Sequence, residues 1–300
     1  MIAKFAQGER LKLPTLIGIA FIHLAALGSI WTFTIHGLIA FLLLFWLTGG
    51  IGICLGYHRL LTHASFKTHR PLKVLITLFG VLALQGGPAS WVSAHRLHHK
   101  EVEQELDPHT PLVNFLWSHF VWLFFDHPEL KTDDQLKRYA ADIMDDRVMV
   151  FFEKTYAILY AFSALLILGL GYGIGALYGY APAGLEPGMA AGWTVGLSML
   201  FWGVFLRTVL VWHATWFVNS ATHVWGYRNF DTDDDSRNSW WVALITFGEG
   251  WHNNHHADAR SAAHGMKWFE IDFTYITIRA MALIGLAWDI ARPRKLDQMS

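Results

Sequence analysis

Long apolar stretches separated by polar segments dominate the pattern of this chain. Four of them have about the 20 mostly apolar residues that an α-helix needs to cross the hydrocarbon core of a bilayer. A short linker, "WTFTIHG", separates the first two, and a turn-rich connector, "YGYAPAGLEPGMAAG", separates the last two, so the pattern predicts two helical hairpins. The four stretches are residues 13–33, 37–57, 154–178 and 193–215.

Basic residues are distributed unevenly around these stretches. Neither hairpin connector contains Lys or Arg, whereas the N-terminal arm carries Lys4, Arg10 and Lys12, and most of the others lie between the hairpins or near the C-terminus. Since Lys and Arg flanking membrane spans stay on the cytoplasmic side, both termini and the central region are expected there. The expected fold is an all-α, multi-pass integral membrane protein, a single domain over residues 1–300, with four transmembrane helices and a cytoplasmic helical cap.

Two shorter apolar runs are each expected to form a helix that lies on or dips into the cytoplasmic face without crossing the membrane. Residues 71–91 are nearly long enough to cross, but "QGGP" interrupts them, and crossing would separate the histidines before and after them. Residues 240–251 are too short. The charged segment 127–148 predicts a solvated helix, and the acidic loop 231–239 a solvated turn, because the spacing of a calcium-binding loop is absent.

Composition supports a membrane protein. Of the 300 residues 53% are hydrophobic and 16% are charged, well below the roughly 25% of soluble domains. Trp and Phe, with 15 and 21 residues, suit interfacial aromatic belts, and a net charge of −1 gives no support for nucleic-acid binding. The single cysteine, Cys54, excludes an internal disulfide and is expected to be structural. The glycines of "GLGYGIGALYG" lie inside a predicted span, which favours close helix packing over a dinucleotide loop.

Histidines gather near the ends of the apolar segments. In "HRLHH" and "HNNHH" three imidazoles occupy positions i, i+3 and i+4, which share one face of an α-helix and should point in nearly one direction. In "HRLLTH" two histidines are five residues apart, a poor spacing for one face, so the helix is expected to end between them. "NSATH" places an asparagine and a histidine one turn apart beyond the fourth span. These elements contain His58, His63, His95, His98, His99, Asn219, His223, His252, His255 and His256.

Nine histidines from four places on one side of the membrane predict a shared metal centre. Imidazole is a ligand for zinc, copper, iron and nickel, and nine ligands exceed the shell of one ion, so two ions are expected. Zinc hydrolases usually add carboxylates or cysteines, so a histidine-rich pair of redox metals favours activation of O₂. An apolar tunnel beside the membrane would exclude water from such an oxidant and accept an acyl chain.

These elements closely resemble the membrane fatty-acid desaturases of the delta-9 acyl type. The three histidine boxes of that family, HxxxxH, HxxHH and HxxHH, stand here as "HRLLTH", "HRLHH" and "HNNHH", and its further histidine element stands as "NSATH". Flanking stretches such as "LQGGPASW", "ELDPH" and "GEGWHNNHHADARSAAHG" are similar to bacterial and cyanobacterial members. The resemblance extends over about residues 35 to 290.

The resemblance implies an O₂-dependent acyl desaturase that inserts a cis double bond, at the delta-9 position, into a saturated chain. It implies two iron ions bound by the ten residues above, with Asn219 acting through water, and no catalytic side chain. It also implies four residues beside which the acyl chain bends, although their chemistry alone favours ordinary packing. These substrate-binding residues are Gln85, Trp91, Thr215 and Trp216.

Electrons are expected from a separate donor, either ferredoxin-like or a small cytochrome, because the sequence shows no haem, flavin or nicotinamide motif. The acyl carrier stays open between coenzyme A, carrier protein and intact membrane lipid. A membrane diiron hydroxylase is the alternative enzyme, because it shares the histidine pattern. A metal transporter or metal sensor is the alternative outside enzymes, but a transporter should have ionisable ligands in the middle of its spans.

Acidic and basic residues near the boxes are candidates for contacts around the ligands, since metal-binding histidines usually donate their second N–H to a carboxylate or carbonyl. Asp107, Glu249 and Asp258 are the acidic candidates, and a solvated carboxylate is the alternative for each. Arg59 and Arg96 could pair with such acids or with an acyl head group. The remaining histidines are expected not to bind metal: His23, His36, His69, His109, His119, His127, His213 and His264.

Overall fold

The computed structural model describes residues 10–294, and the regular structure within them is helical, with only isolated β-bridges. Four helices in this part of the chain are long and apolar enough to cross a membrane, as the sequence predicts. The last three are longer than predicted because the helices continue past the apolar runs. Lys4, which contributed to the predicted sidedness, lies outside the described residues. The four helices are Leu13–Ile30, Ile35–Thr62, Arg147–Tyr178 and Met189–His223.

Three of these helices change geometry along their length. Two contain π-helical segments, which are rare and frequently occur at functional sites. In chain order the pieces are α2 (Leu13–Ala26), the 3₁₀ turn η1 (Leu27–Ile30), α3 (Ile35–Phe45), the π-helix η2 (Trp46–Thr62), α8 (Arg147–Tyr178), α9 (Met189–Leu200), the π-helix η5 (Phe201–Leu206), α10 (Arg207–Ser220) and the 3₁₀ turn η6 (Ala221–His223).

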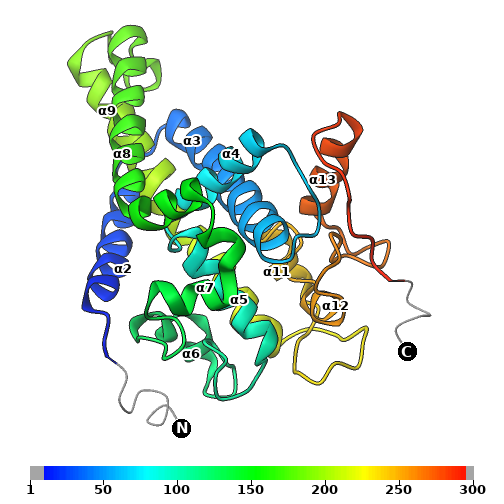
Figure 1. Cartoon of the computed structure of the whole chain (residues 1–300). Helices are drawn as coiled ribbons and strands as arrows, with labels where there is room; N and C mark the ends of the chain where they lie inside the picture. Colours follow the sequence, from blue (N-terminus) through cyan, green and yellow to red (C-terminus); the bar gives the residue numbers. More distant parts are fainter. Residues whose placement is uncertain (1–9, 295–300) are drawn as a thin grey trace.

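Helices α8 and α9 pack closely against each other and extend away from the rest of the molecule (Figure 1). A Cβ atom added to Gly175 would lie 2.2 Å from the carbonyl oxygen of Ala191, and one added to Gly171 would lie 2.9 Å from the Cα atom of Gly196. Only a hydrogen atom fits at these two positions. The prediction that the glycines of this segment allow close helix packing is therefore confirmed.

The prediction of one helix over residues 71–91 is wrong. Helix α4 (Arg70–Val81) ends early, and α5 (Pro88–Lys100) begins after a break over residues 82–87. Within the break Leu84 and Gly86 have φ angles of 55° and 96°, which no α-helix contains. Pro88 then begins the next helix, where its missing N–H has no partner to lose. Neither helix reaches the about 20 residues that a bilayer crossing needs.

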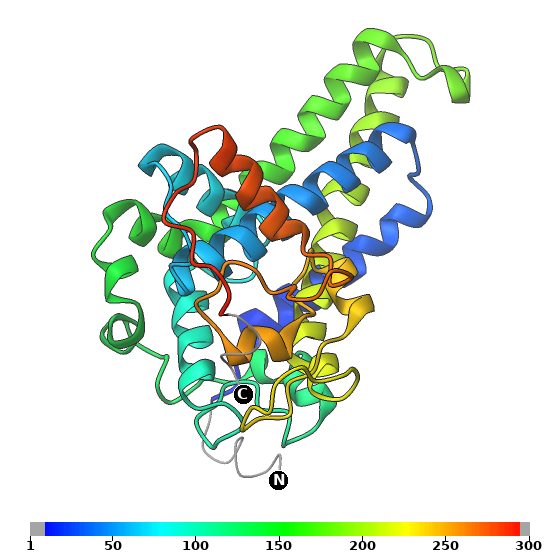
Figure 2. The ribbon, with the colours of Figure 1, turned by 90° about the vertical axis from the view of Figure 1, so that its right-hand side faces the viewer.

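Helices α5, α6, α7 and α12 gather at the end of the molecule away from the α8–α9 connector, in both views (Figures 1 and 2). The charged helix predicted over 127–148 begins only at Asp133, because Thr132 and Gln135 form a capping box there. The helix predicted in the run 240–251 ends at Ile245. The shorter elements are α6 (Phe115–His119), η3 (Val121–Phe124), α7 (Asp133–Met144), η4 (Ala181–Ala183), α11 (Trp240–Ile245), α12 (His252–Ala257) and α13 (Phe273–Leu283).

Candidate metal centre and acyl pocket

The nine predicted histidines converge into two adjoining groups. Within each group the candidate ligand atoms all lie within 4.8 Å of one another. We call them the five-histidine group and the four-histidine group. The five-histidine group consists of His58, His63, His95, His99 and His255, and the four-histidine group of His98, His223, His252 and His256.

Each histidine triplet contributes to both groups, so the expectation that its three rings share one direction is wrong. His95 and His99, one helical turn apart on α5, enter the five-histidine group, while His98 enters the four-histidine group. Adjacent positions on an α-helix point about 100° apart, which separates position i+3 from i+4. On α12 the same spacing sends His255 into one group and its neighbour His256 into the other. A single HxxHH box therefore spans two sites.

His58 and His63 join the same group because η2 is a π-helix. In an α-helix two residues five positions apart point about 140° away from each other. A π-helix closes i→i+5 hydrogen bonds, and His63 N donates to the carbonyl oxygen of His58 at 3.1 Å. The two rings are consequently neighbours, with centroids 4.8 Å apart. The helix ends at Thr62, between the two histidines as predicted, but its last part is a π-helix, which the sequence analysis did not predict.

Helix α5 is held in place at its N-terminus by Glu153 of α8. This carboxylate accepts hydrogen bonds from the backbone N–H groups of Ala89 and Ser90, at 2.7 and 3.1 Å. An anion at this end also interacts favourably with the helix dipole. The long apolar helix α8 thereby fixes the helix that carries the second histidine box.

Helix α12 has only six residues and depends on the two asparagines between its histidines. Asn253 Oδ1 accepts from the backbone N–H groups of Asn229 and Phe230, at 2.8 and 2.9 Å. Asn254 Nδ2 donates to the carbonyl oxygen of His264 at 2.8 Å. Both asparagines are fully buried. Their role escaped the sequence analysis, although two amides inside a histidine box are a signal that could have revealed it.

Four carboxylates each bind the Nδ1–H of one histidine in these groups. Glu249 and Asp107, both expected from the sequence, lie 2.6 Å from His58 and 2.9 Å from His98. The other two carboxylates do not stand out in the sequence. Glu103 accepts from His223 at 3.0 Å, and Asp234 accepts from His256 at 2.6 Å.

Asp234 corrects the prediction of a purely solvated acidic loop, whereas Asp231 of the same loop is fully exposed. Asp258, the third acidic candidate, instead accepts a hydrogen bond from the backbone N–H of Arg294 at 3.1 Å. Sequence alone could not distinguish these carboxylates, because the pairing depends on how the loops fold over the histidines.

Where a carboxylate binds the Nδ1–H of a histidine, the lone pair on the other nitrogen, Nε2, points into its group. A neutral ring that donates from Nδ1 has its lone pair on Nε2. Nε2 of His255 lies 3.2 Å from that of His58 and 2.9 Å from that of His99. Nitrogens bound tetrahedrally at 2.0–2.1 Å to one ion would be about 3.3 Å apart. These separations fit ligands that share a cation.

Burial disfavours the charged form of several of these rings and leaves some nitrogens without a protein partner. It lowers the pKa of His63, His95 and His255, and neighbouring imidazoles lower it further. Nδ1 and Nε2 of His252 and Nε2 of His223 are buried and lack a hydrogen-bond partner. Buried nitrogens without partners are costly unless they bind something. The residues therefore fit a metal centre of two ions.

Glu249 lies just before the third histidine box in the sequence and binds His58 and Arg59 of the first box. Burial would raise its pKa, but Arg59 and His264 hold it well below its usual range. Arg59 is fully buried and binds Glu249 and Asp272, at 2.9 and 2.8 Å. Arg96 likewise pairs with an acid, at 2.7 Å. Both arginines therefore follow the expected pairing with acids, and the acid bound by Arg96 is Asp142 of α7.

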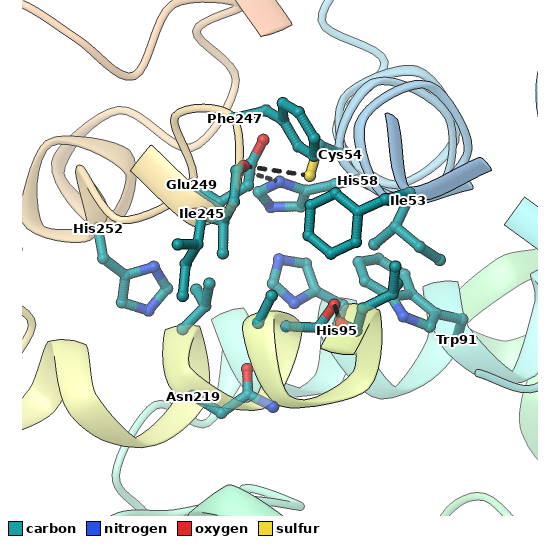
Figure 3. A pocket seen from close by; sticks show the side chains of 17 residues that line it. Ile53, Cys54, His58, Trp91, His95, Asn219, Ile245, Phe247, Glu249 and His252 are labelled. Carbon is teal, nitrogen blue, oxygen red and sulfur yellow. Dashed lines mark hydrogen bonds and ion pairs between the residues drawn. The ribbon is translucent and has the colours of Figure 1, made fainter. Parts of the chain in front are cut away.

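An apolar pocket reaches both histidine groups from between η2, α10 and the segment after α11 (Figure 3). His58 and His95 of the five-histidine group and His252 of the four-histidine group line it. Asn219, which the resemblance places at a metal through water, lines the same pocket. Its apolar wall includes Phe45, Ile53, Val211, Ile245 and Phe247, and Cys54 also lines it. Cys54 donates to the carbonyl oxygen of Thr246 at 3.3 Å.

Three of the four predicted substrate residues are joined at this pocket. Gln85 Nε2 donates to Thr215 Oγ1 at 2.8 Å, and Gln85 Oε1 accepts from Trp91 Nε1 at 3.3 Å. Trp91 and Thr215 line the pocket. Trp216 instead packs in a separate apolar cluster with Trp212, so the structure does not bring it together with the other three.

Six of the eight histidines predicted not to bind metal lie outside every candidate metal group of the described residues. His23, His213 and His119 form a chain of their own, with nitrogen–nitrogen distances of 3.1 and 3.0 Å. The other two each belong to a further candidate group, His264 with His58 and Glu249, and His109 with His98 and Asp107. His264 Nδ1 lies 3.0 Å from Glu249, and the His109 ring is centred 4.3 Å from that of His98. That these two do not bind metal stays a prediction.

Four membrane-length helices, two groups of buried imidazoles and an apolar pocket touching both define a histidine-rich membrane metalloprotein. Residues 31–283 match the sequence model of the family described as fatty acid desaturase. The chain belongs to the fatty acid desaturase family and is an acyl desaturase, an oxidoreductase of lipid metabolism.

Similar proteins include desaturases with different substrates. The chain is 45% identical over 266 residues to an sn-2 palmitoyl-lipid 9-desaturase of Nostoc sp. (strain 36), covering 88% of this chain and 85% of that protein. It is 44% identical over 249 residues to an sn-1 stearoyl-lipid 9-desaturase of Anabaena variabilis, covering 83% and 82%. It is 36% identical over 279 residues to the acyl-CoA 5-desaturase AL21 of Anemone leveillei, covering 92% and 78%.

Proposed function

We propose that this protein inserts a cis double bond at carbon 9 of a saturated acyl chain that is esterified in a membrane lipid. The observation that carries the proposal is the apolar pocket, which touches His58 and His95 of one histidine group and His252 of the other. The two relatives with 44–45% identity are named lipid 9-desaturases, which supports both the position and the lipid carrier.

The metal centre is proposed to hold two iron ions, one in each histidine group. When bound, iron would supply the redox chemistry for reducing O₂ and removing hydrogen from an unactivated C–H bond. Two hydrogens leave adjacent carbons, and O₂ takes them up together with two electrons and two protons, so that two water molecules form. The electrons are proposed to come from a separate ferredoxin-like protein or small cytochrome.

The protein side chains bind and orient rather than react. Glu249, Asp107, Glu103 and Asp234 fix the tautomer and the direction of the histidines that they contact. The apolar pocket wall excludes water, which protects both the oxidant and the surrounding protein. Hydrogen bonds between pocket residues fix where the chain lies, and the position of the reacting carbons follows from that geometry.

The proposed topology is two helical hairpins with the termini and the metal centre on the cytoplasmic side. Support comes from the connectors at residues 31–34 and 179–188, which contain no Lys or Arg, whereas Arg10 precedes the first long helix and Arg147 begins the third. Cysteine-accessibility labelling of single-cysteine variants in oriented vesicles tests this arrangement. A label on both connectors from the cytoplasmic face would contradict it.

A host that lacks its own desaturase tests the enzymatic proposal. Expression of the chain with a working electron donor should produce monounsaturated lipids, with the double bond at carbon 9 when mapped by mass spectrometry. Unchanged saturated chains, despite two bound irons, would contradict desaturation. A hydroxyl group labelled from ¹⁸O₂ would support the hydroxylase alternative, which the relatives do not favour.

A further inference from the structure

The non-helical segment 82–87, between α4 and α5, carries Gln85 in a strained backbone. Leu84 has a φ of 55°, in the left-handed region, which is unfavourable for a residue with a bulky side chain. Such strain persists only where the surroundings fix it, and strained residues cluster at functional sites. The contacts that hold this segment therefore indicate what it does.

Three hydrogen bonds from α10 hold successive carbonyl groups of the segment. Arg207 Nη1 donates to the carbonyl oxygen of Leu82 at 2.8 Å. Trp212 Nε1 donates to the carbonyl oxygens of Ala83 and Leu84, at 2.9 and 3.1 Å. Arg207 and Trp212 are 2% and 3% exposed, so water does not compete for these bonds. Two buried side chains of one helix thus fix the backbone just before Gln85.

Arg207 is a buried cation within a membrane-length helix. Among residues 10–294 its hydrogen bonds go to Leu82, to the carbonyl oxygen of Gly203 and to Thr48 Oγ1, and it forms no ion pair with a carboxylate. Ionisable side chains at such positions are costly and usually functional. An apolar residue of the same volume would pack here at a lower cost. We therefore infer that the guanidinium is present to donate hydrogen bonds to backbone carbonyl groups.

Gln85 links the segment to the pocket through hydrogen bonds, so the place of the segment also determines the place of the pocket residues. Its amide bridges Thr215 on α10 and Trp91 on α5, at 2.8 and 3.3 Å. The Trp91 ring stacks on His95 of the five-histidine group, with centroids 5.2 Å apart and planes inclined by 28°. The distance between two pocket walls, and their placement beside the histidines, therefore depends on where segment 82–87 lies.

We propose that Arg207 and Trp212 are positioning residues that determine where along the acyl chain the double bond forms. This inference rests on the proposed function. By holding segment 82–87 they keep Gln85, and through it the pocket walls, in one place relative to the histidine groups. The acyl chain then bends at one point, and one pair of carbons lies beside the metal centre. Loosening the segment allows neighbouring carbons to reach that place.

Trp212→Phe tests the proposal, because phenylalanine keeps an aromatic ring but lacks the Nε1–H donor. In a desaturase-null host the variant should accumulate with two metals per chain, yet form double bonds at more than one position. Its kcat/KM for carbon 9 should fall about tenfold. Arg207→Met should shift the products in the same way. Arg207→Lys retains a cationic donor, so most of its double bonds should form at the single wild-type position.

Trp202→Phe is the matched control. Trp202 lies in the same long helix, and its Nε1 donates to the carbonyl oxygen of Ser29 at 2.9 Å, so this variant loses an indole bond elsewhere. Its double bonds should stay at one position. The proposal is overturned if Trp212→Phe and Trp202→Phe give the same distribution of double-bond positions, whatever their yields. This comparison does not depend on whether Arg207→Met accumulates. A wild-type chain that forms no double bond would instead refute the proposed function.

Discussion

The two histidine groups consist of the same side chain but are supported by different parts of the molecule. In the five-histidine group, His58 rests on Glu249, a buried carboxylate that also binds the buried Arg59. In the four-histidine group, His223 and His256 rest on Glu103 and Asp234, which belong to two segments near the surface. The five-histidine group is built into the helices and the protein core, whereas the four-histidine group, apart from His98 on the buried Asp107, is completed by loops near the surface.

The two loops also bind each other. The backbone N–H of Asp235 donates to the Glu103 carboxylate at 2.8 Å, so the carboxylate behind His223 also holds the acidic loop. A polar cleft separate from the apolar pocket is lined by His99, His256 and this loop. We therefore expect the four-histidine group to exchange its metal faster than the five-histidine group, because its supporting loops open more easily than packed helices.

Loss of a ligand should have the largest effect on activity. His255→Ala removes a member of the five-histidine group, and His98→Ala a member of the four-histidine group. Each variant should lose one of two irons per chain and all measurable desaturation, because both sites are needed together. Elemental analysis of purified protein checks this. Two tightly bound irons in either variant would show that the grouping is wrong.

Glu249→Gln should have the largest effect on stability. The variant leaves Arg59 buried with Asp272 as its remaining carboxylate. We expect the free energy of unfolding to fall on the order of 2–3 kcal/mol, less than for a fully unpaired buried charge. Thermal unfolding in detergent measures the change. Asp258→Asn is the control, since Asp258 accepts only a backbone bond in the described structure, and an equal loss in both variants would contradict the account.

Asp234→Asn should weaken one metal site while leaving folding unchanged. Loss of a carboxylate behind a metal-binding histidine typically costs about 10- to 100-fold in metal affinity. Competition with a chelator should remove one iron per chain from this variant well before the second. Asp231→Asn in the same loop is the control, because its carboxylate is fully exposed and pairs only loosely with Arg228, at 3.8 Å. If both variants lose iron to the chelator at the same rate, Asp234 does not support the metal site.

A smaller effect of pH is expected at His119, outside both groups. Burial and the nearby His213 lower the pKa of His119 from 6.5 to about 4. Between these values the unfolded chain binds a proton that the folded chain does not, so the free energy of unfolding falls as the pH falls.

Unfolding of wild type and His119→Gln at about pH 7.5 and about pH 5.5 measures this contribution. The stability lost on acidification should be about 1 kcal/mol smaller in the variant. An equal loss would mean that His119 titrates alike in the folded and the unfolded chain.

Repeating patterns made much of the fold predictable. The four apolar stretches predicted four long helices, and the glycines of the third predicted close helix packing, which the structure shows against the fourth. "QGGP" was recognised as an interruption of residues 71–91, but the run was still predicted as one helix, so the break at residues 82–87 was not predicted. The π-helix that joins His58 to His63 was also missed, since hydrophobic periodicity does not distinguish it from an α-helix that ends early.

The nine histidines were predictable because their spacing is chemical information within the sequence itself. Their division into two groups was not predicted, although His98 and His99 are adjacent on a helix and therefore point about 100° apart. Glu103 and Asp234 could not be selected among the many acidic residues, because loop folding brings them to the histidines. Arg207 and Trp212 act through backbone carbonyls, which no side-chain pattern reveals.

Anomalous X-ray scattering at the iron absorption edge, from crystals of iron-loaded protein, tests the central claim most directly. The account predicts two separate peaks, one within the five-histidine group and one within the four-histidine group, at the edge of the apolar pocket. A single peak, or iron bound away from these imidazoles, would contradict it.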